Sequence, residues 1–99
     1  MAFKTGQLIV CVDDSIPPTA VLNSFSSWIK KNAIYTVREF KFMSLLGEYA
    51  VYLKEIENDP IYIEQLGTKV EPGYRASRFR PLEEILQEDL DVIEQEVSL

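Results

Sequence analysis

The residues best suited to bind an anion are three arginines and a pair of lysines: Arg75, Arg78, Arg80, Lys30 and Lys31. A guanidinium group presents several N–H donors in a fixed fork that matches a phosphate or a carboxylate. We expect a short strand over residues 77–81, from which Arg78 and Arg80 project on one face. The lysines are expected nearby if the strands close into a barrel. The leading interpretation is structural, with these cations paired to acidic residues of the body or of the C-terminal helix, and the alternatives are contact with a partner protein or a nucleic acid.

Two further features could in principle do chemistry, an acidic pair and a cysteine. Asp13 and Asp14 could offer oxygen ligands to Mg²⁺ or Ca²⁺. Adjacent residues of a strand point to opposite faces, so we expect the pair to close the strand as a cap or an Asx turn. Cys11 lies in an apolar run and is expected to be a buried structural thiol.

The composition excludes several classes of site. The 99 residues contain no histidine and one cysteine, which rules out histidine-based triads, multi-cysteine metal sites and intrachain disulfides. No nucleophile with a base and an orienting group can be named. We therefore expect no metal, no cofactor and no enzymatic activity.

The charge is divided unevenly along the chain. The formal net charge is −6, yet residues 83–99 contain seven acids and no base. The rest of the chain carries ten basic residues against nine acids, hence +1. An acidic chain argues against non-specific nucleic-acid binding, which needs an excess of Lys and Arg.

The hydrophobic content of 46% is ordinary for one globular domain. The first apolar run, residues 8–12, is too short for a secretory signal or a membrane span. We expect a soluble protein of the reducing cytoplasm, with no membrane partner.

Three strands are indicated, over residues 7–12, 33–42 and 48–56. Both faces of the first are apolar, which is typical of a strand that is covered on both sides or strongly curved. In the second, the apolar positions change phase near Arg38 and Glu39, which predicts a bulge.

The segments between and after these strands carry weaker signals. Apolar spacings of three and four predict a short helix over 19–30, with Thr19 as its cap. Residues 61–66 fit either a strand or one helical turn. The Glu71-Pro72-Gly73 sequence fits a type II turn.

The C-terminal pattern is the clearest helix signal, an amphipathic acidic helix over 82–97 that follows a barrel domain of residues 1–82. The link at 43–47 is unusually apolar because of Met43, Leu45 and Leu46. Something must cover it, either the same chain or another one. We expect the helix of residues 83–99 to pack on its own barrel, with a second copy or a partner as the alternatives.

Several short segments, taken in order, resemble a group of small, uncharacterised bacterial and phage-encoded proteins. The matching segments are 10–15 (VCVDDS), 29–39 (IKKNAIYTVRE), 49–56 (YAVYLKEI), 71–74 (EPGY) and 78–82 (RFRPL). The resemblance implies an SH3-like, partly open β-barrel of about five strands, and no known activity. The group more often has Gly where Asn32 stands, and Asn is a common substitute in left-handed turns. The insert at 17–27 and the acidic tail are less typical of the group.

These observations lead to two main functional hypotheses. The first is a non-catalytic module that binds a protein partner or forms a homodimer through the C-terminal helix or the 43–47 link. The resemblance implies that this module is related to phage-encoded proteins. Aromatic residues such as Trp28 could line a peptide groove, although most are expected to fill the core. The alternative is a nucleic-acid-associated accessory protein that uses the Arg and Lys residues. A further alternative is an inhibitor whose acidic helix imitates DNA.

Overall fold

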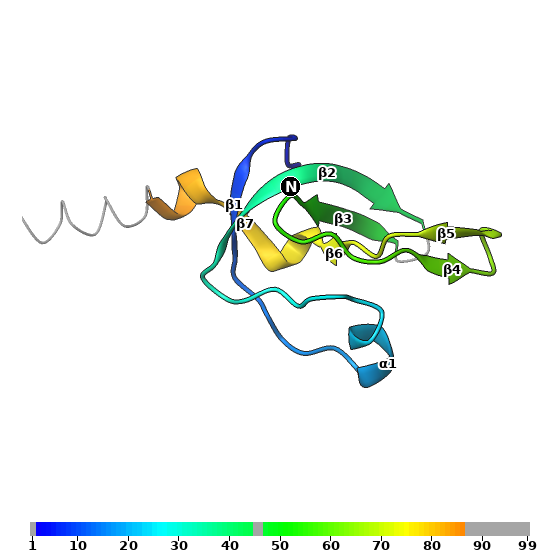
Figure 1. The fold of residues 1–99 in the computed structure, drawn as a ribbon. Helices are drawn as coiled ribbons and strands as arrows, with labels where there is room; N and C mark the ends of the chain where they lie inside the picture. The colour runs from blue at the N-terminus through cyan, green and yellow to red at the C-terminus, as the bar shows by residue number, and fades with distance from the viewer. Residues whose placement is uncertain (1, 45–46, 87–99) are drawn as a thin grey trace, which may run out of the picture.

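The computed structural model describes residues 2–44 and 47–86 and is mainly β-sheet (Figure 1). In chain order, its elements are β1 (Leu8–Cys11), α1 (Thr19–Leu22), β2 (Ile34–Met43), β3 (Glu48–Leu53), β4 (Ile61–Ile63), β5 (Thr68–Val70), β6 (Tyr74–Arg75), the 3-10 helix η1 (Ala76–Arg78) and β7 (Phe79–Pro81). Residues 82–86 are also helical. The expected class, mainly β with short helical additions, is confirmed.

Five strands form one antiparallel sheet in the order β6-β3-β2-β1-β7, and β4 and β5 pair separately. Ile9 of β1 lies opposite Tyr35 of β2 on one side and opposite Pro81 of β7 on the other. The two outer strands, β6 and β7, are joined by only the three residues of η1. This short connection keeps the adjoining ends of the outer strands close together, because four peptide units span little distance.

The core lies against one face of this sheet and is built from the residue types that the strand patterns indicate. Its fully buried side chains include Ile9, Cys11, Ile29, Val37, Val51, Leu53, Tyr74 and Phe79. Three of the four residues of β1 are buried, as its apolar pattern predicts. The predicted bulge is confirmed, since the β2–β3 register shifts between Val37 and Glu39.

The long connection between β1 and β2 is mostly irregular, which corrects the helix predicted over 19–30. Only α1 is helical; Pro18, not Thr19, stands at its N-cap position, and no side chain caps it. The helix ends at Leu22, and further along the connection the backbone N–H groups of Ser26 and Ser27 both donate to Asn58 Oδ1 and not to helix carbonyls. The connection ends at Asn32, whose φ of 73° confirms the expected left-handed turn.

The connection between β3 and β6 carries the small β4–β5 hairpin. The ambiguous stretch after residue 60 is therefore a strand, Ile61–Ile63, followed by a turn and by β5, which the sequence pattern did not predict. The predicted type II turn at 71–73 is wrong, because Gly73 does not have the positive φ that such a turn requires. Glycine is required there for space: a Cβ would lie 3.0 Å from the Ala50 Cβ and from the Tyr52 ring.

The C-terminal helix is described for residues 82–86, and the remainder of the predicted helix lies outside the described residues, as do Leu45 and Leu46. Residues 82–86 leave the sheet beside β1 and β7, at the end away from the β4–β5 hairpin (Figure 1). Within the described ranges, no helix has the length and apolar content needed to cross a membrane.

Candidate functional site

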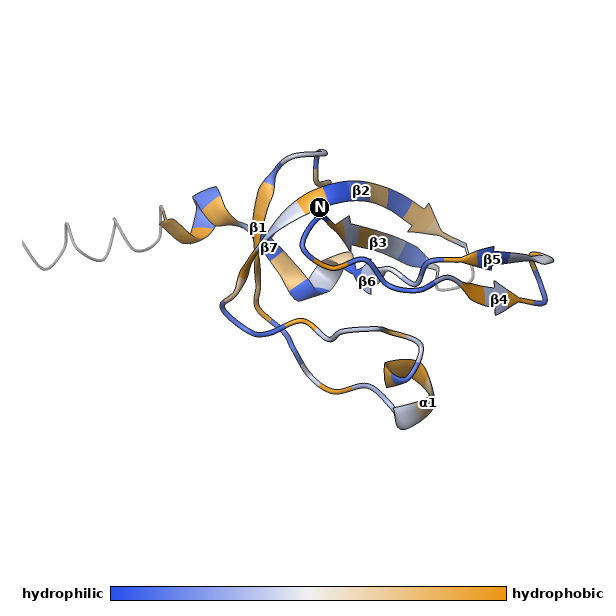
Figure 2. Cartoon of the chain, viewed as in Figure 1, coloured by the Kyte–Doolittle hydropathy of each residue, from blue (hydrophilic) through white to orange (hydrophobic). Residues whose placement is uncertain are grey.

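An apolar groove of about 400 Å³ lies between the β1–β2 connection and the β4–β5 hairpin. The lining residues from the connection are Pro17, Pro18, Val21, Phe25 and Trp28, and those from the hairpin are Ile61, Ile63, Leu66 and Val70. Met43 and residues 71–75 form the sheet side, and Arg78 completes the lining. Figure 2 shows apolar residues on α1 and on β4, the two elements that face each other across this space. A volume of this size is typical of ligand sites.

Three aromatic rings, two from the β1–β2 connection and one from β6, form a continuous part of the groove lining. The Phe25 ring stacks on Tyr74 with centroids 4.8 Å apart, and Trp28 meets the Phe25 ring edge-on at 5.1 Å. Trp28 Nε1 donates a hydrogen bond to the Asp14 carbonyl at 3.0 Å. These contacts hold the rings in place, so the aromatic wall is formed before any ligand binds. Preformed walls reduce the entropy that binding must overcome.

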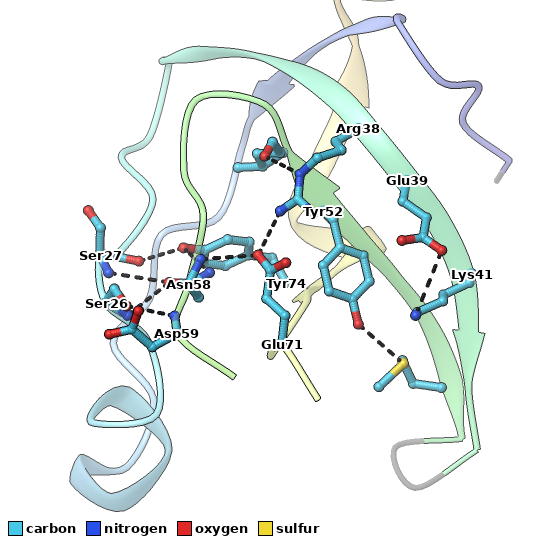
Figure 3. A network of polar contacts seen from close by, with 12 residues as sticks. Ser26, Ser27, Arg38, Glu39, Lys41, Tyr52, Asn58, Asp59, Glu71 and Tyr74 are labelled. Carbon is cyan, nitrogen blue, oxygen red and sulfur yellow. Dashed lines mark hydrogen bonds and ion pairs between the residues drawn. The ribbon is translucent and has the colours of Figure 1, made fainter. Parts of the chain in front are cut away.

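Asn58 ties the β1–β2 connection to the sheet (Figure 3). It is 2% exposed, and its carboxamide oxygen accepts from the Ser26 and Ser27 N–H groups at 2.8 and 3.4 Å. Its Nδ2 donates to the Tyr74 hydroxyl at 3.2 Å, and that hydroxyl donates to the Ser27 carbonyl. One buried side chain therefore links the connection, the β3–β6 segment and β6.

Glu71 extends this network to the bulge of β2 (Figure 3). Its carboxylate accepts from Arg38 Nη2 at 2.6 Å and from the Asn58 N–H at 3.1 Å. Arg38 Nε also donates to the Leu53 carbonyl at 3.0 Å. Burial alone would raise the pKa of Glu71, but the hydrogen bonds from Arg38 and Asn58 outweigh it and lower the pKa below its ordinary value.

The three arginines do not form the single cluster that the sequence suggested. Each has an acidic partner: Arg75 pairs with Glu48 at 3.4 Å, Arg78 with Asp13 at 3.4 Å and Arg80 with Glu84 at 3.7 Å. The predicted strand over 77–81 begins only at residue 79, so Arg78 belongs to η1 and does not share a strand face with Arg80. These ion pairs agree with the structural interpretation, in which the arginines pair with acidic residues of the same chain.

Arg78 has the most buried side chain of the three. Its side chain is 14% exposed, against 55% for Arg75. It donates to the carbonyls of Asp13 and Ser15 at 3.2 and 3.1 Å, and its guanidinium lies 5.0 Å from the centre of the Trp28 ring. Arg78 thus fixes the start of the β1–β2 connection against the aromatic wall of the groove.

The groove brings together four of the predicted site residues: Trp28, Met43, Arg75 and Arg78. Arg80, Lys30 and Lys31 are not part of its lining. The lysines are exposed, and the backbone N–H of Lys31 donates to Asp14 Oδ2 at 3.0 Å. Leu45 and Leu46 cannot be assigned to it, since they fall outside the described residues.

Sequence reasoning missed the apolar residues of the hairpin and of α1. Ile61 and Ile63 alternate with Tyr62, which is exposed, so the period-2 pattern that marks a half-buried strand was present over three residues. That run is too short to separate a strand from a turn of helix. No local sequence pattern indicates that Val21 lines the groove, because its place depends on how the β1–β2 connection packs against the rest of the chain.

The other two chemical candidates have structural roles. Asp13 Oδ1 accepts from the N–H of Ser15 at 2.9 Å, which is the expected Asx turn, and the hydrogen bonds from Ser15 lower the Asp13 pKa. Cys11 is fully buried, and burial raises the pKa of its thiol. The residues described contain no group of three or more metal-ligating side chains. No protein-family model, curated protein or solved structure matches this chain.

Proposed function

We propose that this protein is a non-catalytic interaction module that binds a short apolar segment of a protein in the groove between α1 and the β4–β5 hairpin. The observation that carries the proposal is the groove itself, whose apolar walls are open to solvent. Val21 on one wall is 48% exposed and Leu66 on the other is 47% exposed. Apolar side chains that face each other across an open groove favour a binding role.

The character of the lining favours a peptide over a nucleic acid. Prolines, aliphatic residues and aromatic rings dominate it, and Arg75 and Arg78 both have acidic partners in the same chain. A nucleic-acid site needs cations that are available to neutralise phosphates. Apolar peptide grooves instead use a few pockets for side chains, with polar groups at their margins.

The proposal is consistent with the SH3-like barrel that the sequence resembles. A five-stranded antiparallel sheet whose outer strands are joined by one 3-10 turn supports that assignment. Since small barrels of one fold serve many functions, the groove and not the fold carries the functional argument.

Selection from a random peptide library on the full-length protein tests this function. Binding is read by the fluorescence of Trp28, the single tryptophan, which lines the groove. We expect selected peptides to be rich in aliphatic residues and to bind about tenfold or more weakly to Leu66→Asp. The matched control is Tyr62→Asp, which places the same charge on the same hairpin at an exposed residue outside the lining. Failure to select any peptide, or equal weakening by both substitutions, would contradict the proposal.

A further inference from the structure

The acidic C-terminal segment has the pattern of an occupant for an apolar groove. Its apolar residues, Leu86, Leu90, Ile93 and Val97, recur at spacings of three and four, which predicts one apolar stripe. The segment 83–99 carries seven acids and no base. An isolated helix of this length is marginal in water, so its stripe needs an apolar surface against which to pack.

The charge of the groove does not oppose an acidic occupant. Its two cationic lining residues, Arg75 and Arg78, are each paired with an acid of the body, Glu48 and Asp13. The acid of the lining, Glu71, is already hydrogen-bonded to Arg38 at 2.6 Å, so its charge is compensated within the body. Outside residues 83–99 the chain sums to +1, so an acidic amphipathic segment meets no net repulsion there.

The same chain's segment does not start near its own groove. Leu82 and Leu86 line a separate hollow beside Leu8 and the N-terminal residues, and that hollow shares no residue with the groove. In Figure 1, residues 82–86 lie beyond β1 and β7, while the hairpin that forms one wall of the groove lies at the opposite end. This separation favours the segment of a second molecule over that of the same chain.

We propose that the apolar stripe of residues 90–97 of one copy occupies the groove of a second copy, and that the exchange is reciprocal. This inference rests on the groove being a binding site for apolar segments, as proposed above. A reciprocal exchange relates the two copies by a two-fold axis and makes the same contact twice.

The experiment is sedimentation equilibrium of the full-length protein and of four full-length variants. Two variants break the contact from opposite sides: Leu66→Asp in the groove and Ile93→Asp in the stripe. Two matched controls add the same charge elsewhere: Tyr62→Asp outside the groove lining and Gln95→Asp off the stripe. We expect a dimer for the wild type and both controls, and a dissociation constant raised about tenfold or more for the two contact variants.

Mixing the two contact variants gives the decisive result. Leu66→Asp retains an intact segment, and Ile93→Asp retains an intact groove. An equimolar mixture therefore regains one of the two contacts and forms more dimer than either variant alone. Val21→Asp, on the other wall, provides a second groove variant, and circular dichroism confirms that each variant is folded. A monomeric wild type, or a dimer that Leu66→Asp and Val21→Asp leave intact, would overturn the inference. If the wild type is monomeric while library peptides still bind in a Leu66-dependent way, the inference fails and the interaction function stands.

Discussion

The two sides of the groove are built in different ways. The sheet side contains Gly73 and Tyr74, which are fixed by the pairing of β3 with β6 and by close packing on Ala50. The other side is the irregular β1–β2 connection, which is held by hydrogen bonds from Ser26 and Ser27 to the buried carboxamide of Asn58, by the stacking of Phe25 on Tyr74 and by the burial of Ile29. One wall is held by strand pairing and apolar packing, and the other by contacts of an irregular segment in which a buried polar network takes part.

This difference means that the stability of the sheet and the shape of the groove are partly separable. Loss of a packing contact in the sheet reduces the free energy of unfolding of the whole domain, because the core is shared. Loss of a polar tie at the connection frees a segment with few buried residues and leaves the sheet ladder intact, so local opening precedes global unfolding. Trp28 lies on the connection and reports its position directly.

Asn58→Leu is expected to have the largest effect. It leaves the Ser26 and Ser27 N–H groups without their acceptor and the Tyr74 hydroxyl without a donor. Unmatched polar groups of this kind lower the free energy of unfolding by about 3 kcal/mol. In urea titrations, Trp28 fluorescence should change at lower denaturant than the far-ultraviolet dichroism. The neighbouring Asp59→Asn is the control, since that residue is exposed and enters the network through its backbone N–H. Coincident transitions in Asn58→Leu would show that the two walls are not separable.

Gly73→Ala tests the sheet side. The new methyl group would lie 3.0 Å from the Ala50 Cβ and from the Tyr52 ring, both of which are buried, so these neighbours would have to shift. Overpacking of this kind costs about 2 kcal/mol, and both probes should shift together because the shared core is affected. Gly67→Ala is the comparison: nothing lies within 4 Å, but φ is +66°, so about 1 kcal/mol of backbone strain is expected in the hairpin alone. Separated transitions in Gly73→Ala would contradict the prediction.

The difference between the sheet and the irregular connection also explains which features could be predicted from the sequence alone. Alternation and β-branched residues indicated β1, β2 and β3, and the change of phase at Arg38 predicted the bulge, because strand packing repeats every two residues. Cys11 was also assigned correctly, since burial of a thiol in an apolar strand follows a local rule, whereas the left-handed turn at Asn32 was expected from the resemblance. These features concern neighbours in sequence or positions on one strand face.

The groove was predicted only in part. Trp28, Met43, Arg75 and Arg78 were singled out by residue type, yet their meeting depends on contacts between distant segments. Asn58 bonds Ser26 across 32 residues, and no periodic pattern encodes such a partner. The helix predicted over 19–30 failed for the same reason, because tertiary hydrogen bonds overrode its local propensity.

Glu71→Gln is expected to have a smaller, pH-dependent effect. The pKa of Glu71 is lowered in the folded protein, so its contribution is fully present above the unfolded value of about 4.3 and is lost as pH falls through the folded pKa. The variant should be about 1 kcal/mol less stable than the wild type at neutral pH, and this gap should close in acid. Urea titrations at several pH values measure it. Glu39→Gln is the control, because the ion pair of Glu39 with Lys41 is exposed and its N–O distance is 3.7 Å. This substitution should change the free energy of unfolding by less than about 0.5 kcal/mol. A gap that stays constant with pH would contradict the assigned role of Glu71.

Arg78→Lys is expected to lower stability by an amount similar to that of Glu71→Gln at neutral pH, and it distinguishes two arginines that line the same groove. Lysine retains the charge but cannot donate to the carbonyls of Asp13 and Ser15 while stacking on Trp28, so a loss of about 1 kcal/mol is expected. Arg75→Lys should change stability by less than about 0.5 kcal/mol, because its ion pair with Glu48 is half-exposed. Thermal unfolding measured side by side compares the two variants. If they are equal, Arg78 contributes charge alone; if only Arg78→Lys shifts the Trp28 emission, this arginine positions the aromatic wall through its geometry.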